Sequence, residues 1–277
     1  MTDVQQPKKV ELKLDLRGTL EIANVGVRRA AAFLKIGDQI QELELPDDFA
    51  ISGGVAYSFW PNPLPAETKE TLRNEFQSWI IGSCLKELEQ HFSLFLDRAW
   101  HEVGLADLHG STKPSSFMIK PDEKFSGDTN SASKAEKFLA KTGIELDLEC
   151  LQSLSKARNA LAHGLGQVHE RQVNTDNNSL QVSWIGTDLV LIDGEKEIIY
   201  SDKPVDTYQV KSEDGAPLEM RRKKRTKEFV LGERIQFSQH ELAEICMFYS
   251  QQAAKVHNEL VGYLKTKGIS EAEKKVT

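Results

Sequence analysis

The spacing of apolar residues divides the chain into strand-like and helix-like stretches. Residues 8–64 show the two-residue alternation of a half-buried strand, clearest in Val10–Leu16 and present again in Ile40–Leu45. A third strand is predicted at Gly53–Trp60, directly before a cluster of prolines that ends this stretch. We therefore expect residues 1–64 to form an N-terminal β-rich region.

Helical periodicity replaces this alternation after the prolines. Apolar residues recur every three or four positions over residues 66–100, which predicts one long amphipathic helix. Residues 101–130 lack a strong period and are expected to form a long loop, followed by a short helix at Ser133–Lys141. A further helix is predicted at Leu148–His163, ending before Gly164. The last helix should span Ser238–Lys265, with a capping box made by its first residue and Glu241.

A second β-rich stretch separates the last two of these helices. Strands are predicted at Ser179–Trp184, Leu189–Ile192 and Glu197–Tyr200, and a further hairpin at 228–231 and 234–237. The predicted fold is α+β. An up-and-down helical bundle is formed by residues 65–168 and 238–268, a β-hairpin-rich insertion covers 169–237, and 269–277 is a polar tail.

Composition narrows the classes of function. The chain has 277 residues and a formal net charge of −7, so it lacks the basic field that binds nucleic acid by charge alone. Three cysteines without a CxxC pair indicate reduced, partly buried thiols rather than disulfides or a zinc site. The sequence has no secretory signal and no apolar run of about 18 residues, so we expect a cytoplasmic protein with no membrane span. We also expect no metal and no cofactor.

The most informative chemistry lies at the end of the helix predicted at 148–163. On a helical wheel, Arg158 falls within the apolar arc that contains Leu151, Leu154 and Leu161. An unpaired guanidinium there would cost several kcal/mol, so it either reaches solvent or faces a polar cleft or a partner subunit. Asn159 and His163 are one turn apart and share the adjacent face.

These three side chains suit a phosphodiester. Arg158 could stabilise charge developing on phosphorus, the imidazole of His163 could transfer a proton, and Asn159 could position either the histidine or the phosphate. RNA cleavage through its own 2′-hydroxyl needs these functions and no metal. One protomer offers one such histidine, and a two-fold dimer would supply a second. Asn and His near a helix end also have capping and dipole roles, which is the alternative interpretation.

The segment Lys156-Ala-Arg-Asn-Ala-Leu-Ala-His-Gly164 resembles the signature of the HEPN superfamily (higher eukaryotes and prokaryotes nucleotide-binding domain), in which an Arg precedes a His by four to six intervening residues. The resemblance covers about 66–168 and 238–267. It implies a metal-independent endoribonuclease of toxin–antitoxin or anti-phage defence systems, acting as a homodimer whose Arg158, Asn159 and His163 line a shared cleft. An antitoxin or another defence protein would be a further partner.

The same resemblance leaves a second function open, because other HEPN domains serve as non-catalytic interaction or RNA-binding modules. The weak helical signal of 101–145 and the long β insertion depart from the family pattern. The insertion could either gate the cleft or occlude it.

A basic run near the end of the insertion is a separate candidate for RNA contact. Its cations gain from counterion release if they meet an RNA backbone; the alternative is a solvated hairpin tip. The run consists of Arg221, Arg222, Lys223, Lys224, Arg225 and Lys227. A third hypothesis is thus an RNA-binding protein that uses this run alone.

Two further features receive structural interpretations. His169-Glu-Arg171 follows the motif closely and either assists at the cleft or belongs to a surface loop. The four tryptophans are expected in the core rather than as platforms on which bases stack.

Overall fold

The computed structural model of the chain describes residues 13–41, 43–47, 51–52, 56–109, 122–164, 166–174, 177–200 and 217–269. It has a mixed α+β fold. The helices are α1 (Leu16–Gln41), α2 (Ala66–Leu108), α3 (Glu123–Ser126), α4 (Ser131–Thr142), α5 (Leu148–His163), the 3-10 turn η1 (Glu170–Gln172) and α6 (Gln239–Thr266). The strands are β1 (Ile51–Ser52), β2 (Ala56–Tyr57), β3 (Ser179–Asp193), β4 (Lys196–Tyr200) and β5 (Leu218–Val230).

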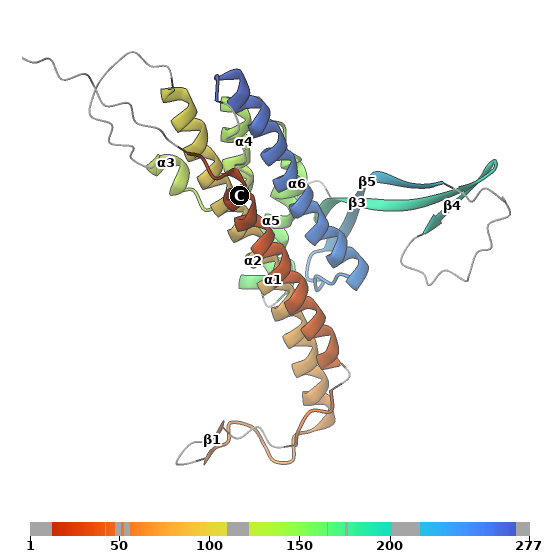
Figure 1. Ribbon diagram of the computed structural model, residues 1–277. Coiled ribbons are helices and arrows are strands. Elements are labelled where there is room, and N and C mark those ends of the chain that lie inside the picture. Colours follow the sequence, from red (N-terminus) through yellow and green to blue (C-terminus); the bar gives the residue numbers. More distant parts are fainter. Residues whose placement is uncertain are drawn as a thin grey trace, which may run out of the picture.

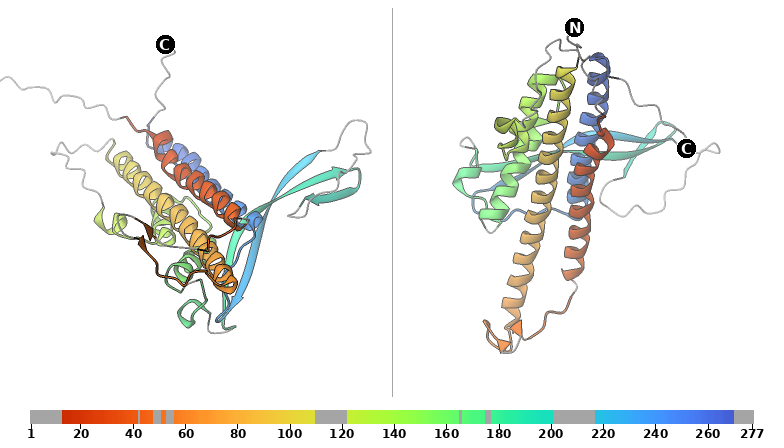
Figure 2. Two further views of the ribbon diagram at one scale, coloured as in Figure 1. Left: turned by 90° about the horizontal axis from the view of Figure 1, so that it is seen from below. Right: turned by 60° about the vertical axis from the view of Figure 1, so that its left-hand side comes forward.

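The two long helices α1 and α2 lie side by side, and the β1–β2 hairpin lies at the far tip of this pair (Figure 1). α6 packs along α1, while α4 and α5 pack against α2. The larger sheet is antiparallel with strand order β4-β3-β5. Its inner part contacts α5 and α6, and its outer part extends away from the helices (Figure 2). Its buried Trp184 joins the same hydrophobic core as Phe92 of α2 and Phe248 of α6.

The predicted N-terminal β-rich region is wrong for the described residues, because α1 occupies 16–41. Of the predicted strand Val10–Leu16, residues 10–12 lie outside the described residues and Leu16 begins the helix. Ile40–Leu45 also fails as a strand, since its first two residues end α1. The third candidate, Gly53–Trp60, contributes only the two-residue strand β2, and 53–55 are not described.

The error overlooked a helical pattern in α1, where Leu16, Leu20, Ala23, Val27 and Ala30 recur at three- and four-residue steps. Its buried positions Thr19, Ala23, Gly26 and Ala30 recur at helical spacing but carry little apolar signal. A Cβ atom placed on Gly26 would lie 2.4 Å from Cβ of His91, so the glycine is what allows α1 to approach α2 so closely. The prediction instead extended the alternation of Val10–Leu16 and Ile40–Leu45 over the residues between them.

Three further predictions need correction. The long helix continues to Leu108, so residues 101–108 are helical rather than loop, and 110–121 are not described. The two strands predicted within 179–192 are one strand, β3. Arg234–Phe237 is not a strand, although Arg234 forms an isolated bridge with Gln167.

The predictions for the last three helices are confirmed. α4 ends at Gly143, which adopts φ 76° as a C-cap. α5 has the predicted bounds, and α6 begins after Ser238 with the predicted capping box to Glu241. The three cysteines are free and buried, and burial raises the pKa of Cys84 to about 12.

A buried acid joins α1 to α2. Glu102 is fully buried; one of its oxygens accepts a hydrogen bond of 2.6 Å from Thr19, and its Oε2 has no hydrogen-bond partner. Burial raises the pKa of the Glu102 carboxyl, an effect that Thr19 and Arg98 oppose. The ionised form is therefore disfavoured in the folded state.

Glu102→Gln is expected to stabilise the protein at pH 7. With a folded pKa above the unfolded value, the contribution of Glu102 to stability is greatest below the unfolded pKa and is lost as pH rises through the folded pKa. The amide has no such loss, so the gain should grow between pH 4 and pH 7. Urea unfolding across this range measures it, with the exposed Glu149→Gln as control. A variant less stable than wild type at pH 7 would contradict the assignment.

Candidate functional site

Helix α5 presents the motif residues from a position between α2 and the sheet. Its buried side contains Leu151, Leu154 and Leu161. A Cβ atom on Gly82 of α2 would lie 3.0 Å from Cβ of Leu161, so the two helices are in close contact near the end of α5. The motif therefore stands on a rigid support rather than on a loop.

Arg158 is held by an ion pair within the chain. Its Nε donates to Oε2 of Glu89 on α2 at 2.7 Å, and the carboxylate is almost fully buried. Ser155 also donates to Glu89. The Arg158 side chain keeps 25% of its surface exposed, and its two Nη atoms have no hydrogen-bond partner within the described part of the chain. Glu89 thus fixes the stem of the guanidinium and leaves its outer fork open.

This ion pair explains how a guanidinium can lie on the apolar face of α5: its charge is paired with that of Glu89. Glu89 was not predicted, although it lies among the apolar residues of its own helix, three residues before Phe92. Each of the two helices carries a charged residue on its apolar face, and the two charges are opposite. This is the sequence signal from which the ion pair could have been predicted. The pair also borders Tyr249, whose pKa is raised well above its ordinary value by burial and, to a smaller extent, by the charge of Glu89.

Asn159 and His163 lie on the opposite, solvent-facing side of α5. Both residues are exposed, together with Gln152 and Lys156 at helical spacing. Within the described residues, neither side chain makes a hydrogen bond or an ion pair. At about 100° per residue, Arg158 and His163 point roughly 140° apart around the axis, so the structure does not bring their side chains together within one chain.

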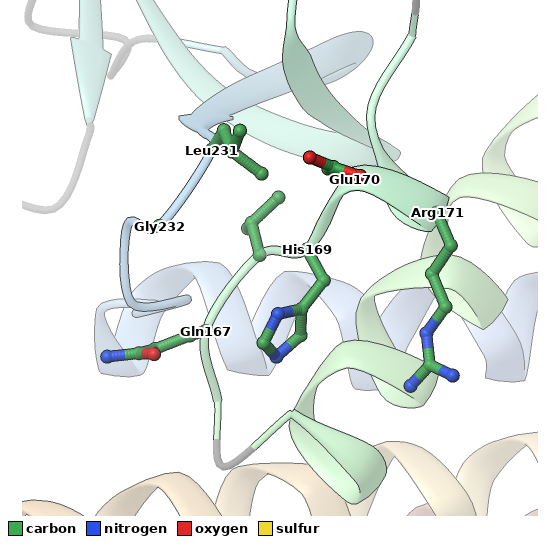
Figure 3. A pocket seen from close by; sticks show the side chains of 7 residues that line it. Gln167, His169, Glu170, Arg171, Leu231 and Gly232 are labelled. Atoms are coloured by element: carbon green, nitrogen blue, oxygen red, sulfur yellow. The ribbon is translucent and has the colours of Figure 1, made fainter.

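An open depression of about 500 Å³ lies beyond the end of α5. It does not include the motif residues; Figure 3 shows the side chains that line it. They are Gln167, Val168, His169, Glu170, Arg171, Leu231 and Gly232. The segment His169–Arg171 is thus both surface-exposed and part of a recess next to the motif helix.

The basic run lies within strand β5, not at a hairpin tip. Its cations are largely neutralised by carboxylates of the same chain, and Lys223 alone has no ion-pair partner among the described residues. The pairs are Arg221 with Glu197 and Glu219, Arg222 with Asp147, Lys224 with Glu149, Arg225 with Asp188 and Glu244, and Lys227 with Glu241. An RNA backbone would have to displace these acids, which weakens the hypothesis that the run binds RNA by itself.

The tryptophans divide between the core and the surface. Trp184 is buried, and Trp100 stacks on Phe125 with ring centroids 4.2 Å apart. Trp60 and Trp79 are 43% and 61% exposed, so the expectation of four core tryptophans is wrong for these two. Trp79 follows Ser78, the residue of α2 that lies against Gly166 just beyond α5.

Comparison of the chain with protein-family models, with curated proteins and with solved structures found no match. Among the described residues, no group of three or more His, Cys, Asp or Glu side chains is arranged to hold a metal ion. Helices in that part of the chain all fall short of the length and apolar character needed to cross a membrane.

Proposed function

We propose that this chain is a metal-independent endoribonuclease of the HEPN type, with Arg158, Asn159 and His163 as its site. The observation that carries the proposal is the set of side chains on the last turns of α5: an exposed imidazole and amide one turn apart on one face, and on another face a guanidinium whose stem is fixed and whose fork is open. This is the residue set of the HEPN-like motif on the helix where that motif is expected.

The chemistry assigned to each residue follows from its setting. His163 is exposed and can exchange a proton with the 2′-hydroxyl or with the leaving oxygen. Glu89 orients Arg158, so little side-chain entropy would be lost when its Nη atoms meet a phosphate. Asn159 shares the face of His163 and would position the phosphate beside the imidazole.

A homodimer would bring Arg158 and His163 to one cleft, since they diverge within one chain. The exposed side of α2 offers a surface for the second copy. Trp79 is largely exposed there, its ring 5.5 Å from that of Phe76, and exposed Trp is typical of protein interfaces. In a cell, such an enzyme would act as a toxin or anti-phage defence effector and would require an inhibiting partner.

A non-catalytic HEPN module is the second candidate, and one observation favours it. The carboxylate of Glu89 already neutralises Arg158, which lowers the gain from binding a phosphate. Such a module would bind RNA or a protein without cleaving it.

Metal-free cleavage distinguishes the two candidates. We expect the full chain to cleave single-stranded RNA in EDTA, and His163→Ala to reduce the rate at least 100-fold, because the loss of a general acid or base costs about 10²–10⁴. His163 is exposed and makes no hydrogen bond or ion pair with the described residues, so its variant should remain folded. His109→Ala, an exposed histidine at the end of α2, is the matched control. Wild-type RNA left intact, or equal cleavage by His163→Ala, rejects the nuclease.

A further inference from the structure

The chain reverses direction directly after α5 and returns a second histidine to the end of that helix. Gln167 N–H donates to the carbonyl of Gly164 at 2.9 Å, and Gly166 adopts φ 81° within this turn. A Cβ atom on Gly164 would lie 2.7 Å from Cδ2 and Nε2 of His169. The His169 ring therefore lies against the backbone of the residue that follows His163.

Backbone hydrogen bonds hold this histidine in place. Val168 N–H donates to the carbonyl of Glu233 at 2.9 Å, and Gly232 N–H donates back to the carbonyl of Val168 at 2.9 Å. His169 N–H donates to the side chain of Gln172 at 2.7 Å. The imidazole is thus carried by a segment anchored to the chain after β5, while remaining exposed.

The surroundings of His169 suit a phosphate. Figure 3 shows the side chains of His169 and Arg171 extending to the same side of their shared segment, within the depression described above. Gln167 adds an amide donor to the lining. The charged neighbours are Glu170 and Arg171 on the same segment and Glu233 and Arg234 on the adjoining one. No ion pair engages Arg171 among the described residues, in contrast to the cations of β5 other than Lys223.

We propose that His169 is the second proton-transferring residue of the site and that Arg171 binds an RNA phosphate next to the scissile one. The inference rests on the proposed ribonuclease function and changes one part of it. The second imidazole comes from the same chain as His163 rather than from the partner copy. The partner would still complete the cleft through Arg158.

The reaction balances with these two groups and no other reactant. One imidazole, neutral, removes the proton of the 2′-hydroxyl as this oxygen forms a bond to phosphorus. The other, protonated, gives its proton to the 5′-oxygen as the bond from phosphorus to that oxygen breaks. The products are a 2′,3′-cyclic phosphate and a free 5′-hydroxyl, and the two imidazoles exchange protonation states.

The test is the pH dependence of cleavage by full-length variants. Wild type is expected to show a bell-shaped profile of kcat. His169→Asn should lower kcat at least 100-fold and remove one limb of the bell, with little change in KM. His169→Phe keeps a ring packed against Gly164 but cannot transfer a proton. It should lose activity to the same extent as His169→Asn, which shows that the loss comes from the missing proton transfer and not from misfolding. Arg171→Gln should raise KM several-fold with the bell retained. His109→Asn is the control.

Mixing the variants tests whether both histidines belong to one chain. Co-refolded His163→Ala and His169→Asn chains should stay inactive, since each same-chain site lacks one histidine; restored activity overturns the same-chain arrangement. An unchanged bell in both His169 variants overturns this inference and leaves the ribonuclease function standing. A wild type that cleaves no RNA overturns the ribonuclease function itself.

Discussion

Arg158→Lys is expected to lower RNA cleavage by about 10²–10³-fold while leaving the fold intact. A lysine still places a positive charge near Glu89, so the buried carboxylate keeps a counter-ion. It lacks the planar fork whose outer nitrogens would contact the phosphate, and removing one such donor costs about 2.7–4 kcal/mol of transition-state stabilisation. Single-turnover cleavage in EDTA, together with urea unfolding of the same samples, separates the two effects.

Arg158→Ala is the informative comparison because it removes both roles. It leaves Glu89 buried without its guanidinium, so stability and activity should fall together. Cleavage by Arg158→Lys at the wild-type rate would show that Arg158 serves only as the counter-ion of Glu89, which would favour the non-catalytic candidate.

The helix that carries Arg158 and His163 is predicted with its observed bounds because its local signals are strong. α5 lies between an irregular stretch and Gly164, and α6 carries a capping box at Ser238; both signals depend on residues within one or two turns. The same is true of the turn at Gly194, which joins β3 to β4. Local chemistry therefore predicted α4, α5, α6 and the β3–β4 hairpin, but not the extent of β5.

What could not be predicted depends on contacts between distant residues. The close approach of α1 to α2, which buries Ala23, Gly26 and Ala30, is a contact of this kind. The pairing of Arg158 with Glu89 spans 69 positions, and the neutralisation of β5 uses acids from α5 and α6. A basic run looks like a binding surface in sequence, and only its fold shows that Lys224 and Lys227 are already engaged.

These long-range contacts also connect stability with the candidate site. Glu89 accepts hydrogen bonds from Arg158 and Ser155, and Ser131 of α4 lies 3.5 Å from the same carboxylate. One buried side chain thus joins α2, α4 and α5. The orientation of Arg158, the proposed phosphate-binding group, therefore depends on the packing of three helices. A change at Glu89 should alter both the stability of the fold and this orientation.

Glu89→Ala is accordingly expected to be among the most destabilising single substitutions in the chain. Removing one partner of a buried pair costs about 3–5 kcal/mol, because the remaining charge and donors lose their acceptor. Arg158 is 25% exposed and can turn partly toward solvent, which places the expected loss near the lower end, about 3 kcal/mol. Glu89→Gln should cost less, since its amide oxygen can still accept from Ser155 or Arg158. Urea unfolding at pH 7 measures the series.

The matched control is Glu149→Ala, which breaks the exposed pair with Lys224 and should leave the unfolding midpoint almost unchanged. If Glu89→Ala unfolds at the same urea concentration as this control, Glu89 does not join the three helices. Arg158 would then be free of its tether, and the proposed pre-orientation of its fork toward a phosphate would be lost as well.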